Sequence, residues 1–205
     1  EITGFSNPLL KEIRGLREKK MRKRAGLFLA EGLRIMTEAR EAGFLPEMLF
    51  RVKDRPLHDL EVTLEVEVLA NGGDVIETSA DIMAKLSGKD NAQAVVGVYR
   101  DHGTALADVD RGTAPIWLVA QSMRDPGNLG TMLRTGDAVG AGGLILIDDC
   151  TDPFSVESVR ASMGAIFTQK IVQCRWEEFT AWLRSGPGQL VGTSLQTDTE
   201  YQAAR

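Results

Sequence analysis

Residues 116–167 constrain the fold of this 205-residue chain more than any other stretch. Two short, almost wholly apolar runs, residues 116–120 and 144–147, flank a polar loop and a region of helical spacing. Unbroken apolar runs of this length are typical of strands that are covered on both faces, as in a parallel sheet. A helix between two such strands makes a β-loop-α-β unit. The stretch therefore predicts an α/β fold.

The loop between the runs has the sequence Asp125-Pro126-Gly127-Asn128-Leu129-Gly130. A Pro-Gly step cannot extend a strand, so we expect the chain to turn there. Asn128 is a favourable N-cap for the helix that follows, and this helix also carries Arg134. Ligands of open α/β sheets bind at the carboxyl ends of the strands. We therefore expect Asn128 and Arg134 to face a functional site.

The chain divides at residues 101–114, a polar, glycine-containing segment that we interpret as a linker, long enough to let two domains reorient. His102, in this linker, is expected to be exposed. Residues 1–100 are predicted to form a small α/β/α domain with strands at 27–30, 48–52, 65–69 and 94–99, helices near Asn7, after Gly32 and at 80–86, and a loop at 86–90. Residues 115–205 are predicted to add a helix capped by Ser155, strands at 168–173 and 189–194, and a helix at 177–183.

The run RDPGNLGTMLRTGDAVG, with DPFSVESVRASMGAIF after it, resembles the first motif of the SpoU/TrmH family and the segment that follows it. Members are S-adenosylmethionine-dependent RNA 2′-O-ribose methyltransferases of the knotted SPOUT superfamily. The run NPLLKEIRGLREKKMRKRAGLFLAEGLRIMTEA resembles the substrate-binding domain of many members, which has a fold like a small ribosomal protein (L30e-like). The resemblance covers nearly the whole chain. It implies an RNA-binding domain followed by a SPOUT α/β domain with a parallel sheet.

By this resemblance the motif asparagine falls on Asn128 and the catalytic arginine on Arg134, which in the family is thought to help deprotonate the ribose 2′-hydroxyl. The resemblance also implies a homodimer, with rRNA as the favoured substrate and tRNA as the second choice. Two later family motifs build the trefoil knot and most of the S-adenosylmethionine pocket, and neither is visible before Arg205. We therefore expect a fragment whose knot is incomplete and whose cofactor-binding residues are mainly missing.

The residue types of the motif suit this chemistry. A planar guanidinium makes paired, charged hydrogen bonds to phosphate. It stays almost fully protonated at neutral pH, so an orienting, electrostatic role for Arg134 is physically easier than proton abstraction. Plainer roles stay open: Asn128 as a helix cap alone, and Arg134 in an ion pair with Asp137 or Asp148.

Charge is unevenly distributed along the chain. The net charge is −5, but residues 11–24 hold eight Lys or Arg and two Glu, a net of +6, which leaves −11 on the remainder. A basic segment on an acidic body suits phosphate contact, although a solvated helix face has the same pattern. With the resemblance, we predict RNA contact by Lys11, Arg14, Arg17, Lys19, Lys20, Arg22, Lys23, Arg24 and Arg160. For Arg160, a surface salt bridge is an equal alternative.

Two other classes of function compete with this interpretation. Gly127 follows a strand and Asp148 lies 21 residues beyond it, which mimics the ribose-binding acid of a nicotinamide dinucleotide site. Against that, DPGNLG lacks the GxGxxG pattern. The second rival is an RNA-binding protein without catalysis. Trp176 and Trp182 could stack on RNA bases, but aromatic residues at helical spacing more often lie in a core.

The sequence disfavours several other classes. No run of about 18 apolar residues occurs, so no transmembrane helix is expected, and no secretory signal is seen, which favours a cytoplasmic protein. Cys150 and Cys174 are expected to be free thiols. No CxxC or His/Cys spacing suggests a metal site. His58 and His102 lie far from the motif in sequence, which argues against histidine triad chemistry.

Overall fold

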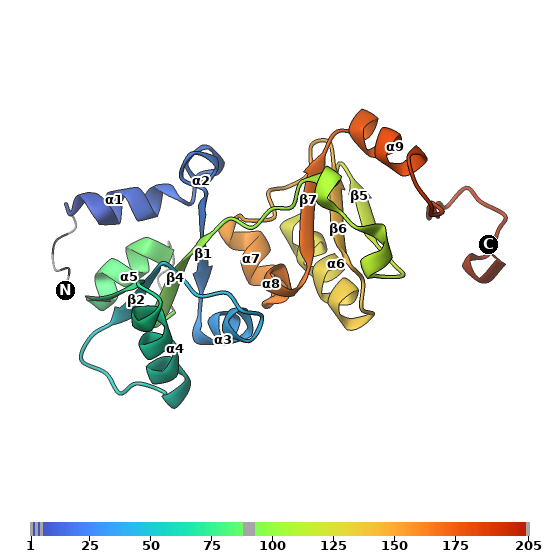
Figure 1. Ribbon diagram of the computed structural model, residues 1–205. Coiled ribbons are helices and arrows are strands. Elements are labelled where there is room, and N and C mark those ends of the chain that lie inside the picture. Colours follow the sequence, from blue (N-terminus) through green and yellow to red (C-terminus); the bar gives the residue numbers. More distant parts are fainter. Residues whose placement is uncertain (1, 3, 5, 88–92, 204–205) are drawn as a thin grey trace.

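Figure 1 shows the computed structural model, which describes residues 2, 4, 6–87 and 93–203. The described chain forms two α/β halves, each with its own sheet, and its two ends lie on opposite sides of the molecule (Figure 1). The α/β class predicted from the sequence is confirmed. The expected loop at 86–90 lies mostly outside the described residues.

The N-terminal half has helices on both faces of its sheet. Its elements are α1 (Pro8–Gly15), α2 (Lys19–Ala25), β1 (Leu27–Glu31), α3 (Leu33–Glu41), β2 (Met48–Val52), α4 (Asp59–Ala70), β3 (Asp74–Thr78), α5 (Ala80–Ser87) and β4 (Val95–Arg100). The strand order is β1-β4-β2-β3; β4 runs antiparallel to β1 and β2, and β2 runs parallel to β3. Apolar side chains of α1 and α5 pack on one face, and those of α3 and α4 pack on the other.

The C-terminal half is built on three parallel strands in the order β5-β6-β7. Its elements are η1 (Leu106–Asp108), η2 (Arg111–Thr113), β5 (Leu118–Gln121), α6 (Pro126–Ala138), β6 (Gly143–Ile147), α7 (Val156–Ser162), α8 (Ala165–Thr168), β7 (Lys170–Cys174), α9 (Trp176–Arg184) and η3 (Tyr201–Ala203). Leucines of α6 join the core on one face of this sheet, whereas Phe179 of α9 joins the core on the other. The parallel arrangement places the loop before α6 at the carboxyl end of β5.

The strand expected at 65–69 is wrong, because these residues belong to α4. The alternation of charged and apolar residues there imitates a strand. The buried residues Glu61, Leu64 and Val68 instead follow helical spacing. Arg55 pairs with Glu61 from outside the helix, so a buried acid is compensated by a partner that local sequence does not reveal. The strand expected at 189–194 is also wrong, since these residues form no ladder with the sheet.

Residues 101–114 pack against the C-terminal half, which differs from the expectation of a free linker. The backbone N–H of Thr104 donates to the carbonyl of Ile171 at 2.8 Å, and Thr104 lies beside β7 in an isolated parallel bridge with Val172. Val109 is buried in the core beneath α9. The Arg111 guanidinium lies 3.9 Å from the centroid of the Trp182 ring, a cation–π contact.

The sequence predicts an exposed His102, but the structure places it within a cluster of phenylalanine rings. Its ring centroid is 4.7 Å from that of Phe44 and 5.3 Å from that of Phe154. Its Nε2 forms a hydrogen bond with the carbonyl oxygen of Ile166 at 2.8 Å. Phe44 belongs to the N-terminal half and Phe154 to the C-terminal half, so this cluster joins the two halves.

Candidate functional site

The helix α6 begins where its local sequence requires. Asp125 is the N-cap, and its Oδ1 accepts a hydrogen bond from the backbone N–H of Asn128 at 2.6 Å. Pro126 occupies the first helical position, where its missing N–H leaves no bond unmade. Asn128 therefore lies inside the first turn, and the expectation that it is the cap is wrong. Its side chain is exposed and is not needed to start the helix.

Asn128, Thr131 and Arg134 form an exposed row along α6. Residues three apart are neighbours on a helix surface, and the Arg134 Nη2 donates to the Thr131 Oγ1 at 3.2 Å. On the opposite face, Leu129 and Leu133 are fully buried. The two residues singled out by the sequence motif thus share one solvent-facing surface of α6.

Neither carboxylate considered as a partner for Arg134 is bound to it. The Asp137 Oδ1 accepts a hydrogen bond from the Thr168 Oγ1 at 2.7 Å. The Asp148 carboxylate accepts hydrogen bonds from Gln121 and Trp176. Among the residues that the structure describes, Arg134 takes part in no ion pair. Its positive charge is therefore available to an anionic ligand such as an RNA phosphate.

Asp148 caps α9 from the carboxyl end of β6. Its Oδ2 accepts from the Gln121 Nε2 at 2.9 Å, and its Oδ1 accepts from the backbone N–H of Trp176 at 3.0 Å. The hydrogen bond from Gln121, followed by that from Trp176, holds the pKa of this carboxyl below its usual range. A dinucleotide site would need this acid for a ribose and an open helix N-terminus for the pyrophosphate. Here Asp148 already accepts two hydrogen bonds, and the carboxylate of Asp125 occupies the start of α6. Both features disfavour a dinucleotide site.

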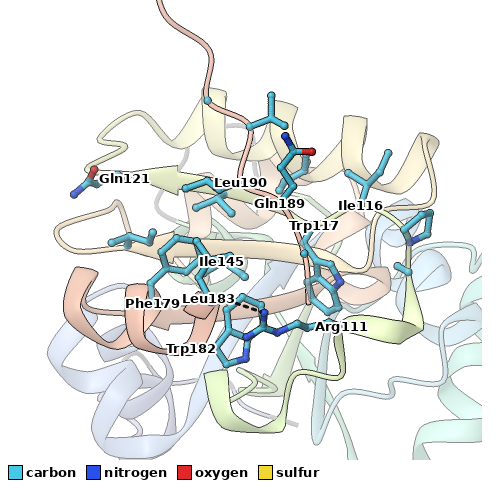
Figure 2. Close-up of a pocket in the computed structure, with 18 of the residues that line it drawn as sticks. Arg111, Ile116, Trp117, Gln121, Ile145, Phe179, Trp182, Leu183, Gln189 and Leu190 are labelled. Carbon is cyan, nitrogen blue, oxygen red and sulfur yellow. Dashed lines mark hydrogen bonds between the residues drawn. The ribbon is translucent and has the colours of Figure 1, made fainter. Parts of the chain in front are cut away.

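A groove of about 860 Å³ runs along β5 and the face of the sheet that carries α9 (Figure 2). Its walls are mainly apolar and include Trp117, Ile145 and Phe179. Gln121 lies at the end of the groove that coincides with the carboxyl edge of β5 (Figure 2). The size falls within the range of about 300–1,000 Å³ that is usual for small-molecule sites.

Most of the side chains predicted to contact RNA are exposed on α1, α2 and the turn between them. These exposed side chains are Lys11, Arg14, Arg17, Lys19, Lys20, Lys23 and Arg24. They remain candidates for phosphate contact. The basic run is split into two helices, so its charges are spread over more than one helix face.

Arg22 and Arg160 are instead held in ion pairs that cross between the two halves. The Arg22 Nη2 lies 2.8 Å from the Asp152 Oδ2, and the Arg160 Nη2 lies 2.6 Å from the Glu31 Oε2. Arg22 is buried, which contradicts the prediction that it contacts RNA. For Arg160, the salt bridge is the alternative that the structure contains. Sequence reasoning missed Glu31 and Asp152 as partners, because no local pattern links residues about 130 positions apart.

Other candidate features contribute little chemistry. Within the described ranges, no group of three or more His, Cys, Asp or Glu side chains is arranged to hold a metal ion. No described helix has the length and apolarity needed to cross a membrane. Cys150 and Cys174 are free thiols, and burial raises the pKa of Cys174 to about 11. Trp176 is 42% exposed, which departs from the expectation that it lies in a core.

The class of protein is defined by a parallel sheet with a polar motif at its carboxyl edge, joined to an α/β/α half that carries a basic segment at residues 11–24. Residues 7–97 match the MRM3-like substrate binding domain, and residues 115–204 match the SpoU rRNA Methylase family. The chain belongs to the SpoU rRNA Methylase family, as the sequence resemblance predicted.

Individual relatives agree with this assignment. An rRNA methyltransferase from Sinorhizobium meliloti is 34% identical, with a TM-score of 0.89 over all of this chain and 76% of that one. Its AdoMet-bound structure gives 35% identity and a TM-score of 0.82, over 90% and 68% of the two chains. The 23S rRNA (guanosine(2553)-2'-O)-methyltransferase RlmP of Bacillus subtilis is 29% identical over 98% of this chain and 76% of the relative. The chain spans only 40% of the human mitochondrial rRNA methyltransferase 3, to which it is 28% identical.

Proposed function

We propose that the protein transfers a methyl group from S-adenosylmethionine to a ribose 2′-oxygen of rRNA. The observation that carries this proposal is the exposed guanidinium of Arg134, which forms no ion pair with a described residue and lies on the same solvent-facing side of α6 as Asn128. Family membership supplies the reaction class. The Bacillus relative, named as a 2'-O-methyltransferase of 23S rRNA, supports the choice of ribose oxygen and of rRNA over tRNA.

The groove provides a test of whether this chain can accommodate the cofactor. An adenosyl group needs a flat apolar wall and polar groups at its ribose. The groove offers apolar surface from Ile147 and Trp176 next to the amide of Gln121, at the same edge of the sheet as the start of α6. These residues fit the cofactor and would contribute to holding it there. When bound, S-adenosylmethionine supplies an electrophilic methyl group.

Arg134 then acts on the RNA. Its charged fork binds a phosphate beside the target nucleotide and so orients the ribose, and it stabilises the negative charge that develops on the 2′-oxygen as the hydroxyl proton passes to water. Asn128, with a carbonyl oxygen and an amide N–H₂ group, can accept from the hydroxyl or donate to the sugar. The Asp125 cap fixes the turn that carries Asn128. The exposed Lys and Arg side chains of α1 and α2 hold structured RNA through its phosphates and shape.

We further propose that the protein works as a homodimer in the cytoplasm. The family resemblance supports the homodimer, and the bacterial rRNA relative supports the compartment. One chain has a mass of 22.4 kDa. Sedimentation at the concentrations used for activity measurements is expected to give about twice that mass, and a single species at the one-chain mass would contradict the dimer.

The decisive experiment is transfer of labelled methyl from S-adenosylmethionine to unmodified rRNA and tRNA transcripts. We expect label on rRNA, resistant to alkali at a single linkage, as a 2′-O-methyl group must be. Arg134→Ala should reduce transfer by about 100-fold or more. The matched control Arg184→Ala, which removes an exposed arginine from the end of α9, should leave transfer unchanged. Alkali-labile label, or RNA binding without any transfer, would refute the proposed reaction; the second result would indicate a binding protein.

A further inference from the structure

One hydrophobic cluster spans the two halves: it contains Phe28 of the N-terminal half together with Leu129 and Phe167 of the C-terminal half. Phe28 of β1 lies 5.0 Å from Phe154 and 5.8 Å from Phe167, measured between ring centroids, and both partners belong to the C-terminal half. Gly164, before α8, approaches Glu38 of α3 so closely that a Cβ added there would lie 2.7 Å from the Glu38 Cβ. The packing between the halves is therefore tight at this contact and leaves no room for an added methyl group.

At the margin of this interface stands a charged pair. Glu31 ends β1, and its side chain is only 4% exposed. Its Oε2 accepts from the Arg160 Nη2 at 2.6 Å, while its Oε1 is buried without a hydrogen-bond partner among the described residues. A buried carboxylate is costly without its counter-charge. The halves can therefore slide or rotate only by breaking this pair at a large energetic cost.

Arg160 connects this pair to the helix that carries the site. The next residue along α7, Ala161, lies directly against Gly130 of α6, where an added Cβ would be 2.4 Å from the Ala161 carbonyl carbon. The two helices α7 and α6 are therefore in direct contact at Gly130, and α6 carries Asn128 and Arg134. The helix α7 therefore connects the N-terminal half to the proposed catalytic surface, and Figure 1 shows it between β1 and α6.

Methyl transfer requires that the ribose of the bound RNA be held accurately relative to α6. The ribose oxygen must be held in near-attack geometry, and a displacement of about 1 Å can lower a rate by about 100-fold. RNA gripped by the basic side chains of the N-terminal half is presented to Arg134 only if the two halves keep one orientation. We propose that Glu31 and Arg160 are positioning residues, whose ion pair sets where RNA bound by the N-terminal half meets α6. This inference rests on the proposed function.

The variants Glu31→Gln, Arg160→Gln and the double variant test it in single-turnover methyl transfer at saturating RNA and cofactor, alongside measured RNA Kd values. We expect each single variant to lower the transfer rate by about 10- to 100-fold while RNA affinity changes less than about threefold. The double variant should be no slower than the slower single variant, because both changes remove one interaction. Arg160→Lys, which keeps the charge, should restore part of the rate. Arg40→Gln, which breaks the Arg40–Glu67 pair within the N-terminal half, is the matched control and should leave the rate unchanged.

Two outcomes would overturn the inference. If Arg160→Gln weakens RNA binding tenfold and Glu31→Gln does not, Arg160 contacts phosphate directly. If the single variants transfer methyl at the unmodified rate, or if their effects simply add in the double variant, the pair does not position the RNA.

A distance measurement separates this inference from the proposed function. Spin labels at Thr63→Cys on α4 and Glu177→Cys on α9, both exposed, report the separation of the halves once Cys150 and Cys174 are replaced by Ala. We expect one narrow distance distribution, which broadens or shifts in Glu31→Gln but not in Arg40→Gln. If the unmodified protein fails to methylate rRNA, the proposed function is wrong. The distance distribution still tests whether the ion pair sets the orientation of the halves, and an unchanged distribution in Glu31→Gln rejects that inference.

Discussion

Arg22 and Asp152 are 130 residues apart in sequence, yet they form the most enclosed ion pair between the two halves. The guanidinium donates to the Asp152 Oδ2 at 2.8 Å, and its Nη1 also donates to the carbonyl oxygens of Leu16 and Arg17 at 2.8 and 2.7 Å. The side chains are only 6% and 12% exposed. One arginine therefore closes the turn between α1 and α2 and fastens that turn to the C-terminal half.

Replacing Arg22 with Gln is expected to lower the free energy of unfolding by about 3–5 kcal/mol, because it leaves a nearly buried carboxylate and two carbonyl oxygens without their donor. Urea denaturation at neutral pH measures this. The neighbouring exposed residue provides the control: Lys23→Gln should leave stability within about 0.5 kcal/mol. Lys23→Gln should weaken RNA binding and reduce the slope of log affinity against log salt concentration by about one. Equal stability losses in the two variants would contradict the structural role of Arg22.

The contact between Gly130 and Ala161 leads to a second prediction. In Gly130→Ala the new methyl group would lie 2.4 Å from both the carbonyl carbon and the Cβ of Ala161, so α6 and α7 must separate. We expect a stability loss of about 1–3 kcal/mol from overpacking, together with slower methyl transfer, because α6 carries Arg134. Gly192→Ala, where no atom lies within 4 Å, is the matched control for stability alone, because Gly192 also lines the groove. Adding Ala161→Gly should restore little, since the Ala161 backbone is itself in the way; full restoration would show that only the side chains clash.

Much of the second sheet could be predicted, because the signals there are local. Apolar runs marked β5 and β6, and Ser155 does cap α7, accepting from the backbone N–H of Ser158 at 3.2 Å. Asn128 is not the cap because Asp125, three residues earlier, accepts from the backbone N–H of Asn128 and starts the helix before it. Local sequence also placed Arg134 on an exposed face of this helix, as the structure shows.

Several other failures come from pairing between residues that are distant in sequence. Glu65 was assigned to a strand, but it faces Arg51 at 2.9 Å from within α4, so a charged residue takes a partly enclosed position that local pattern reasoning assigns to apolar ones. His102 was expected in a solvated linker, yet rings from both halves surround it. Arg22 belongs to the most basic run of the chain, and only its distant partner Asp152 shows that it is structural.

The roles of Asp125 and Asn128 can be separated by a third pair of variants. Asp125→Ala removes the N-cap of α6 and should cost about 1 kcal/mol of stability. Asn128→Ala leaves the cap intact, because Asp125 bonds the backbone N–H and not the side chain. It should keep the melting temperature and reduce methyl transfer. Thermal denaturation and transfer assays on the same preparations check this. A large loss of stability in Asn128→Ala, with transfer unaffected, would mean that Asn128 is structural alone.

The depressed pKa of Asp148 gives a final prediction, on pH. Hydrogen bonds from the Gln121 side chain and the Trp176 backbone favour the charged carboxylate in the folded state. The folded state therefore binds this proton less readily than the unfolded chain does, and stability rises with pH across the interval between the two values. The contribution of Asp148 is complete above the ordinary aspartate pKa of about 3.9, and it is lost as pH falls through the depressed value.

Asp148→Asn should therefore be less stable than the unmodified protein at pH 7, and the difference should shrink in urea denaturations at progressively lower pH. Asp149→Asn, whose carboxylate is 77% exposed and lies 3.8 Å from Arg124, should show almost no difference at any pH. A gap between Asp148→Asn and the unmodified protein that stays constant down to acid pH would show that the carboxylate does not stabilise α9 through its charge.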